Sequence, residues 1–524
     1  MNVTSYNLAA GRPYRVEAVR GPVMEEQTQL TDGLRASLDP NDAQWVRFTK
    51  GTTRGIIIDL GAEKSVERVS IRFLQVSDQK MFFPAVVSLF ASADGLEWGL
   101  AAHIPSKMQV WHAGPPHDQF YVWEGQTDGL RTGDGRAGAF AARYVKITFT
   151  SDLNLMTDGL EVWGTDEMTQ ATGRTAPCSL AYMQPGEHSA GIRDLMLLYN
   201  GYYKNGSGNW EKDDMIPYIS YVDEQGNPID WMFDGVLHLG LISPSGLSFE
   251  VGSADVVNDW KWYLDKTFAA GGDLDQLNEA TKEVAGKIGP ADKRTKVVLM
   301  LPNPGVLKAS FEVRNGELTA YDGGELSMAG ELEMKLMLLR WYVDQLESRW
   351  SAKGYAHLEL SGIYWLSEGV SVDIPLEDSL IRSVGDLVHE RGYRFYWIPY
   401  FYGGRSFDWQ ELNFDAAVLQ PNHFFNDTEE ERIEDTAVLA KLYGMGIEME
   451  FDERMNEDPA YRRKYIEYLN GGVLYGYMTD TFKGYYQGNR ALLNSARSTN
   501  PANRQLYDWM YQFVKGTYTI QVVE

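Results

Sequence analysis

Two glutamates at the ends of apolar runs are the residues of this chain whose type and spacing best suit acid/base chemistry. Glu368 ends the run Gly362–Glu368, and Glu450 lies in the run Gly446–Phe451. Hydrolysis of a glycosidic bond requires such a pair, because one carboxyl group protonates the leaving oxygen while the other attacks or stabilises the oxocarbenium-like carbon. The sequence therefore predicts Glu368 and Glu450 as catalytic residues.

The second run has two faces, because successive side chains of a strand point to opposite sides. Ile447, Met449 and Phe451 form an apolar face, and Glu448 and Glu450 share the other face. We expect the apolar face to pack under helices, which turns both glutamates inward. A buried carboxylate without compensation is unfavourable, so the pair has either a function or a structural ion pair with Arg or Lys. Glu448 would support the site from one layer deeper.

The elements that must position these residues are predicted from short apolar runs that alternate with amphipathic segments over residues 191–524. The predicted strands are Asp194–Tyr199, Trp231–His238, Lys296–Pro302, Leu358–Glu368, Phe395–Phe401, Ala417–Asn422, Gly446–Phe451 and Leu474–Asp480. Helices are predicted at Glu331–Trp350, Ser379–Arg391, Glu429–Tyr443 and Ala460–Leu469. Alternating strands and helices imply a parallel sheet, and eight strands favour a closed (β/α)8 TIM barrel. An open doubly wound sheet is the alternative, but no Gly-rich phosphate loop follows the first strand.

Polar and aromatic residues near the strand ends are predicted to bind substrate, because active sites of this fold lie at the C-terminal ends of the strands. The chain has 30 Tyr, 21 Phe and 15 Trp, and aromatic planes can stack on the apolar faces of sugar rings. The predicted substrate-binding residues are Tyr199, Asn200, Asp234, Trp365, Tyr400, Gln420, Asn422, Glu448 and Tyr477.

Residues 1–165 have a different pattern, with short alternating strands between turn residues, which is typical of an all-β domain. Clear strands are Gly55–Leu60, Val66–Phe73, Val86–Ser92 and Tyr144–Thr150. Two packed sheets would bury their apolar faces, so an antiparallel β-sandwich is predicted. Residues 166–190 are predicted to be a linker.

Six ordered motifs of this domain resemble the discoidin (coagulation-factor type C) module, a jelly-roll-like fold shared by many carbohydrate-binding modules. The motifs are Leu30–Gly33, Trp45–Phe48, Ile58–Gly61, Ser92–Trp98, Ala142–Ile147 and Leu160–Gly164. The resemblance implies a structural Ca²⁺ held by Asp32 and Glu161, as oxygen donors suit this ion; a turn Asp and a surface Glu are the alternative. It also implies sugar contacts from variable loops, here at Phe82, Phe83, Trp111 and His112.

Residues 190–520 resemble the bacterial domain-of-unknown-function family 4855. The motifs that carry this resemblance are Asp194–Gly201, Trp231–Gly235, Gly362–Glu368, Tyr396–Tyr400, Leu419–Asn422 and Gly446–Asp452. The family implies a bacterial, secreted or cell-surface protein related to polysaccharides. Glutamates on strands four and seven also resemble clan A of the retaining glycosidases, which implies that Glu368 is the acid/base and Glu450 the nucleophile. Ser367 stands where that clan has Asn.

Charge and composition exclude several classes of partner. The net charge of −25 argues against nucleic acid and anionic membranes; it indicates a soluble surface or an acidic groove for a neutral or cationic glycan. No apolar run has the length of a membrane helix, and no signal peptide is visible. The single Cys178 excludes an internal disulfide, and no cofactor is expected for catalysis.

The function predicted from these patterns is an endo-acting, retaining glycoside hydrolase that takes a polysaccharide or oligosaccharide. Two alternatives remain open. A non-catalytic glycan-binding barrel would keep the aromatic residues without a working carboxyl pair. A polysaccharide lyase would need a Tyr or His base and basic residues to neutralise a uronate.

Overall fold

The computed structural model describes residues 4–18, 24–48, 51–109, 113–131, 133–135, 137–151, 153–169, 171–426, 428 and 431–522. The chain divides into two compact units. The first comprises Met1–Leu180, Ser371–Asp373 and Asp427–Asp435, and the second comprises Ala181–Val370, Ile374–Asn426 and Thr436–Glu524. The change of unit after Leu180 falls inside the segment that was predicted as a linker.

The first unit is an antiparallel sheet whose strands wrap around one core, as in discoidin-like modules. Its strands are β1 (Tyr6–Asn7), β2 (Tyr14–Ala18), β3 (Met24–Gln27), β4 (Val46–Phe48), β5 (Gly51–Gln75), β6 (Val86–Ser92), β7 (Gly99–Pro105), β8 (His117–Glu124), β9 (Ala139–Ser151), β10 (Leu155–Thr165) and β11 (Thr172–Gly173), with the short helix α1 (Gly125–Asp128). The predicted β-sandwich is confirmed.

Strand β5 joins the two layers of the sandwich, because it is long enough to belong to both. Its first part, around Ile57, pairs with β2 and β9, and its last part, around Ile71, pairs with β8 and β10. Ile58 of the first part and Ile71 of the second lie in the same buried core. The sequence predicted two separate strands here, whereas hydrogen bonds run through one continuous strand.

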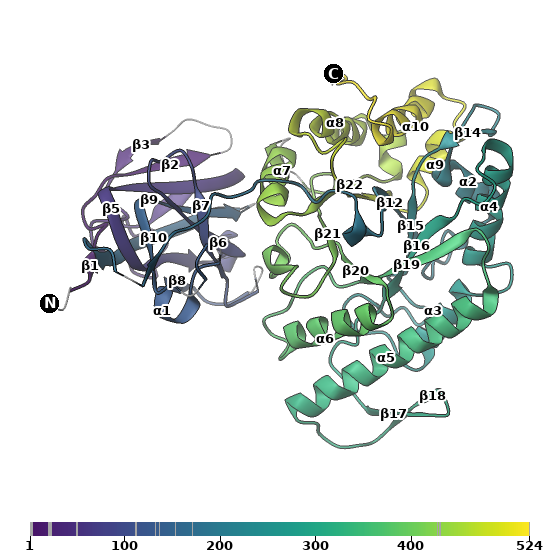
Figure 1. Ribbon diagram of the computed structural model, residues 1–524, viewed down its shortest axis with the longest axis horizontal. Coiled ribbons are helices and arrows are strands. Elements are labelled where there is room, and N and C mark those ends of the chain that lie inside the picture. The colour runs from purple at the N-terminus through teal and green to yellow at the C-terminus, as the bar shows by residue number, and fades with distance from the viewer. Residues whose placement is uncertain are drawn as a thin grey trace. The chain divides into compact units, whose positions relative to one another are not determined.

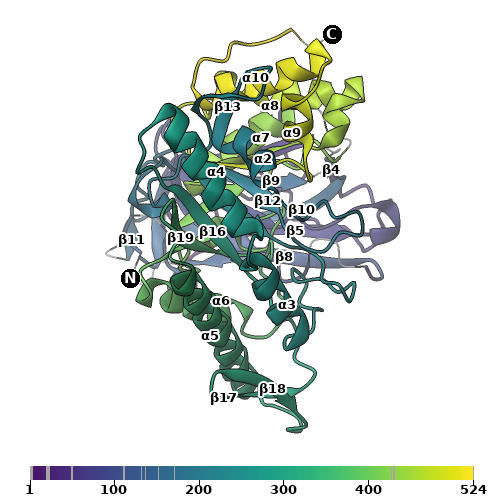
Figure 2. The ribbon, with the colours of Figure 1, turned by 90° about the vertical axis from the view of Figure 1, so that its right-hand side faces the viewer.

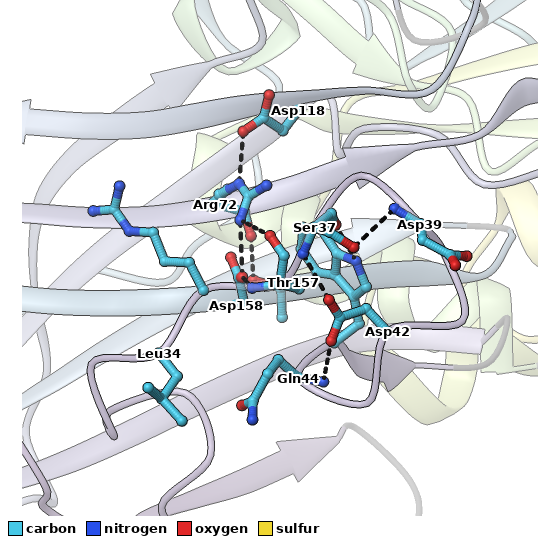
Figure 3. Close-up of polar contacts among 12 residues, drawn as sticks. Leu34, Ser37, Asp39, Asp42, Gln44, Arg72, Asp118, Thr157 and Asp158 are labelled. Carbon is cyan, nitrogen blue, oxygen red and sulfur yellow. Dashed lines mark hydrogen bonds and ion pairs between the residues drawn. The ribbon is translucent and has the colours of Figure 1, made fainter.

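A buried arginine fastens the loop between β3 and β4 onto the sheet (Figure 3). Arg72 Nε donates to Asp118 Oδ2 at 2.6 Å, and its Nη1 donates to Asp158 Oδ2 at 2.9 Å and to the carbonyl of Ala36. The guanidinium also lies 4.7 Å from the ring centroid of Trp45. Since Arg72 and Asp158 are 5% and 1% exposed, the pairing of their charges is what makes their burial tolerable.

The second unit is a closed parallel barrel surrounded by helices, so the predicted (β/α)8 fold is confirmed. The barrel strands are β12 (Asp194–Tyr199), β15 (Gly235–Leu239), β16 (Thr295–Leu301), β19 (Leu358–Trp365), β20 (Arg394–Trp397), β21 (Ala416–Leu419), β22 (Gly446–Glu450) and β23 (Lys483–Tyr486). They are nearly all buried on both faces, which is why their sequences are continuous apolar runs. The barrel closes where β23 pairs with β12, with Lys483 opposite Asp194.

Helices cover the barrel on the outside (Figures 1 and 2). They are α2 (Lys212–Ile219), α3 (Asn258–Thr267), α4 (Asp273–Ile288), α5 (Met328–Lys353), α6 (Glu377–Glu390), α7 (Glu431–Tyr443), α8 (Pro459–Tyr475), α9 (Ala491–Ala496) and α10 (Pro501–Val514). Two short hairpins, β13 (Ser220–Val222) with β14 (Pro228–Trp231) and β17 (Ser310–Arg314) with β18 (Glu317–Tyr321), extend the connections. Both views show β17 and β18 beside α5.

The eighth strand lies later in the chain than the sequence predicted. Helix α8 continues through Gly471 and Gly472 to Tyr475, beyond the predicted end at Leu469. A Cβ on Gly472 would collide with the ring of Phe513 on α10, so this glycine allows close helix packing. The strand then forms at Lys483–Tyr486.

No helix in the described part of the chain combines the length and apolar character that a membrane crossing requires.

Candidate active site

Glu450 is the last residue of β22, the seventh barrel strand, and its carboxylate receives two hydrogen bonds. The backbone N–H of Asn422 and the hydroxyl of Tyr468 both donate to Glu450 Oε2, each at 2.5 Å. Glu450 is 3% exposed. Two donors on one oxygen stabilise the ionised form and fix the direction of the carboxylate.

The two donors are held by local structure that the sequence specifies. Asn422, in the loop after β21, has a φ of +56°, a left-handed conformation that Asn tolerates better than most residues. Tyr468 lies on α8, which begins with an N-cap at Asp458 and Pro459 in its first turn. Tyr468 is fully buried, and the N–H of His423 donates to its hydroxyl at 3.2 Å.

Glu368 follows β19, the fourth barrel strand, and lies beside Glu450. Burial, followed by the charge of Glu250, raises the pKa of Glu368 to about 7, and the charge of Glu450 acts in the same direction. A hydrogen bond from the side chain of Gln420 opposes the shift. The half-buried Glu368 therefore carries a proton over part of its population at neutral pH, as a general acid requires.

Glu448 lies one layer below, as the alternation on β22 predicted. It is 2% exposed, and in the described part of the chain its Oε1 has no hydrogen-bond partner. Burial, with the charges of Glu450 and Glu368, raises its pKa well above the ordinary value. The raised pKa favours the protonated form of Glu448, and no basic side chain in the described residues pairs with it.

Four tyrosines surround these carboxyl groups, from β12, β19, the loop after β20, and β23. Burial and then nearby charges raise the pKa of each one, and Glu368 or Glu448 contributes in every case. The ring centroids of Tyr199 and Tyr486 are 5.5 Å apart, and the N–H of Tyr400 donates to the carbonyl of Glu368 at 2.9 Å. The four residues are Tyr199, Tyr364, Tyr400 and Tyr486.

The structure therefore brings most of the predicted residues together around the two glutamates. These residues are Tyr199, Tyr400, Gln420, Asn422 and Glu448. Asn422 contributes its backbone, since its side-chain oxygen accepts a hydrogen bond from Asn426.

Two predicted substrate-binding residues belong to other parts of the barrel. Asn200 is fully buried and donates to Thr267 and Asp273, while Tyr263 donates to its oxygen at 2.7 Å. This network ties β12 to α3 and α4 and leaves no amide atom for a sugar. Asp234 precedes β15, at the opposite end from the carboxyl groups, and accepts the N–H of Arg193 at 2.7 Å.

Two residues that were predicted as aromatic contacts also lie away from the two glutamates. Trp365 is fully buried, with its ring centroid 6.5 Å from that of Phe395. Its neighbour Tyr364 faces the carboxyl groups, so Trp365 must face the opposite side of the same strand. Tyr477 is fully buried after α8, and its hydroxyl donates to the carbonyl of Tyr468.

Four residues of the site were not predicted from the sequence, and one of them, Tyr364, was passed over in favour of its neighbour Trp365. Tyr486 was missed because the eighth strand was misplaced, and Tyr468 because it lies on a helix. Glu250 lies in the loop after β15, where no strand-end pattern marks it. The sequence signal that could have indicated Glu250 is its position between Phe249 and Gly252, in a loop on the catalytic side of the barrel.

The barrel matches a known protein family. The model of the family described as "Domain of unknown function (DUF4855)" matches residues 194–512, which is more than half of the chain. The chain belongs to this family. The resemblance inferred from the strand-end motifs is thereby confirmed.

Solved structures match the region that precedes the DUF4855 domain. A chitosan-binding module from a Paenibacillus sp. IK-5 chitosanase/glucanase is 16% identical, covers 30% of this chain and 99% of its own, and has a TM-score of 0.18. A fucose-binding module of Streptococcus pneumoniae is 15% identical, with 32% and 99% covered and a TM-score of 0.21. A GH29 fucosidase of Ruminococcus gnavus in complex with fucose is 19% identical, with 32% and 27% covered and a TM-score of 0.20. At these TM-scores none of the three supports a statement on function. No curated protein matches the chain.

The residues predicted to hold calcium before the DUF4855 domain do not fit that role. Glu161 Oε1 accepts from Arg35 at 3.1 Å, and its Oε2 accepts from Trp163 and lies 3.6 Å from Arg68. Asp32 Oδ1 accepts the N–H of Leu34 at 2.7 Å, as in a turn. Among the described residues no group of three or more His, Cys, Asp or Glu is arranged to hold a metal ion.

The predicted sugar-binding loops of the same unit are described only in part. Phe83 is buried at 1% exposure, and its ring centroid lies 5.1 Å from that of His117, so it belongs to the core. Phe82 is half-buried. Trp111 and His112 lie outside the described residues.

Proposed function

We propose that the DUF4855 domain of this chain hydrolyses glycosidic bonds of a polysaccharide, with Glu368 as acid/base and Glu450 as nucleophile. One observation carries this proposal: the two carboxyl groups lie together at the C-terminal ends of strands four and seven, in different environments. Glu368 has a raised pKa of about 7, while Glu450 is fixed by two hydrogen-bond donors. Carboxyl groups whose environments differ in this way are suited to separate acid and nucleophile roles.

The reaction follows from those roles. The Glu450 carboxylate attacks the anomeric carbon and forms an ester bond to the sugar, while Glu368 gives its proton to the departing oxygen. A water molecule then adds its oxygen to the anomeric carbon, gives a proton to the Glu368 carboxylate, and releases Glu450. The product keeps its anomeric configuration. Tyr199, Tyr400 and Tyr486 would contact the sugar that occupies the site.

We further propose that the enzyme is endo-acting, that the discoidin-like unit holds it on the same glycan, and that the protein works outside the cell or on its surface. The discoidin motifs support the second point, and the size of a polysaccharide, which does not enter cells, supports the third.

The test is the release of reducing ends from a panel of neutral, acidic and amino-sugar polysaccharides. Glu450→Gln is expected to abolish release, and Glu368→Gln to reduce it most on substrates with poor leaving groups, which need the proton. Glu359→Gln is the matched control, because Glu359 is exposed at the other end of β19. Circular dichroism verifies the fold of each variant.

Two results would contradict the proposal. Full activity of Glu450→Gln would remove Glu450 from the mechanism. Binding without any release of reducing ends across the panel would leave a glycan-binding barrel. NMR observation of the first-formed anomer decides separately between retention and inversion.

A further inference from the structure

Glu250 is a carboxylate of the active site that the glycosidase mechanism does not use. Its backbone is tied to the catalytic strand, because the hydroxyl of Ser367 donates to the Glu250 carbonyl at 2.9 Å, and Glu368 is the next residue after Ser367. Asn303, beyond β16, donates to the same Ser367 hydroxyl, and its N–H donates to the carbonyl of Phe249 at 3.0 Å. These bonds hold Glu250 beside Glu368.

A close approach of two loops makes this placement rigid. Gly252 has a φ of +66° and Gly305 a φ of +57°, and a Cβ on either residue would collide with the backbone of the other. Only glycine allows both the left-handed backbone and this contact. The loop that carries Glu250 is therefore clamped to the loop beyond β16.

Glu250, Glu368 and Glu448 have no ion pair with a basic side chain in the described part of the chain. Burial alone raises the pKa of Glu250, and no basic side chain contributes to the shifts of Glu250, Glu368 or Glu448. Glu448 also has its unpartnered, fully buried Oε1. A cationic ligand would favour the ionised form of these groups and could donate a hydrogen bond to them.

Three basic residues that follow β22 and β23 in the chain are engaged elsewhere. Arg454 pairs with Asp452 at 2.7 Å and lies 3.9 Å from the ring centroid of Tyr461. Lys464 donates to the carbonyl of His423 at 2.9 Å, and Arg490 pairs with Asp214 at 2.5 Å. A cationic ligand would supply a positive charge that these side chains do not provide.

We infer that the substrate is a glycan with free amino groups, and that Glu250 binds the ammonium group of a 2-amino-2-deoxyhexose unit next to Glu368. An ammonium group supplies both a positive charge and three hydrogen-bond donors. A uronate would be repelled by the same carboxylates, and an N-acetylated sugar would offer one amide N–H without charge. This inference rests on the proposed function for the position of the sugar.

The test compares pairs of oligosaccharides that differ only in N-acetylation. The probes are hexamers of β-1,4-linked glucosamine and of α-1,4-linked galactosamine, each also fully N-acetylated, titrated calorimetrically into the Glu450→Gln variant at low and high salt. At least one free-amine hexamer is expected to bind ten-fold or more tightly than its N-acetylated partner, and salt should reduce this preference.

Glu250→Gln, added to the same variant, is expected to remove most of the preference for the free amine, whereas Glu359→Gln should keep it. Both substitutions replace one glutamate by glutamine, so the test variant and its control differ only in position. The inference is overturned if neither pair shows a preference, or if the preference survives in Glu250→Gln. Hydrolysis of a neutral glycan with no preference for amines would refute the inference alone, while amine-specific binding without hydrolysis would refute only the proposed function.

Discussion

Replacing Tyr468 by Phe tests whether the hydrogen bonds on Glu450 matter for catalysis. The change deletes one of two donors to Glu450 Oε2 and keeps the ring that packs in the core. A hydrogen bond to a charged group contributes about 1.5–3 kcal/mol, and each 1.4 kcal/mol corresponds to about a factor of ten in rate. Because the Asn422 N–H remains on the same oxygen, we expect the lower part of that range, a fall in kcat/KM of roughly 10–30-fold.

The same helix provides a matched control. Tyr465 also lies on α8 and is 1% exposed, but its hydroxyl donates to the backbone carbonyl of Leu506 at 2.7 Å. Tyr465→Phe should lower the free energy of unfolding by about 1 kcal/mol and leave kcat/KM unchanged. The assay is the initial rate of reducing-end release, with KM and kcat separated, and urea unfolding of both variants. If Tyr468→Phe lowers kcat no more than Tyr465→Phe does, Tyr468 does not position the nucleophile.

Three further predictions concern titration and stability. The pH profile of kcat/KM should fall above about pH 7, where Glu368 loses its proton; a plateau to pH 9 would exclude Glu368 as the acid. Glu448 has a raised pKa, so its contribution to stability is present below its ordinary value near 4.5 and is lost as pH rises towards the folded value. Glu448→Gln should therefore raise the Tm more at pH 8 than at pH 5, and an equal change at both pH values would contradict the raised pKa of Glu448. Asp158→Ala removes one partner of the buried Arg72 and should lower the free energy of unfolding by about 3 kcal/mol, measured by urea denaturation; a loss under about 1 kcal/mol would show that Asp118 suffices.

The fold could be predicted from the sequence because its signals are local. Fully buried parallel strands give short apolar runs, and the runs at Asp194–Tyr199 and Gly446–Glu450 have the predicted positions within one residue. The eighth strand could not be placed, since nothing local shows that Gly472 lies inside a helix. Residue 472 is a glycine because a Cβ there would collide with the ring of Phe513 on α10. This contact joins distant parts of the chain.

Position at the strand ends predicted Glu368, Tyr400 and Gln420, and side-chain alternation predicted which residues of one strand face the site. That rule turned Glu448 and Glu450 inward on strand seven. The same rule places Tyr364 and Trp365 on opposite faces of strand four. The strand-end pattern alone predicted Trp365, and not Tyr364, as a substrate contact. Asn200 shows the other limit, because its partners on α3 and α4 are long-range contacts that no strand-end pattern indicates.

The closure of the barrel between β12 and β23 has a consequence for synthesis of the protein. The β12 strand leaves the ribosome about 290 residues before Lys483, its partner across the seam. At roughly 5–20 residues per second, the nascent chain carries this apolar strand for about 15–60 s before its second neighbour exists. An apolar strand with an unpaired edge is a site of aggregation, so the yield of folded protein should depend on chaperones that bind β12 during that interval.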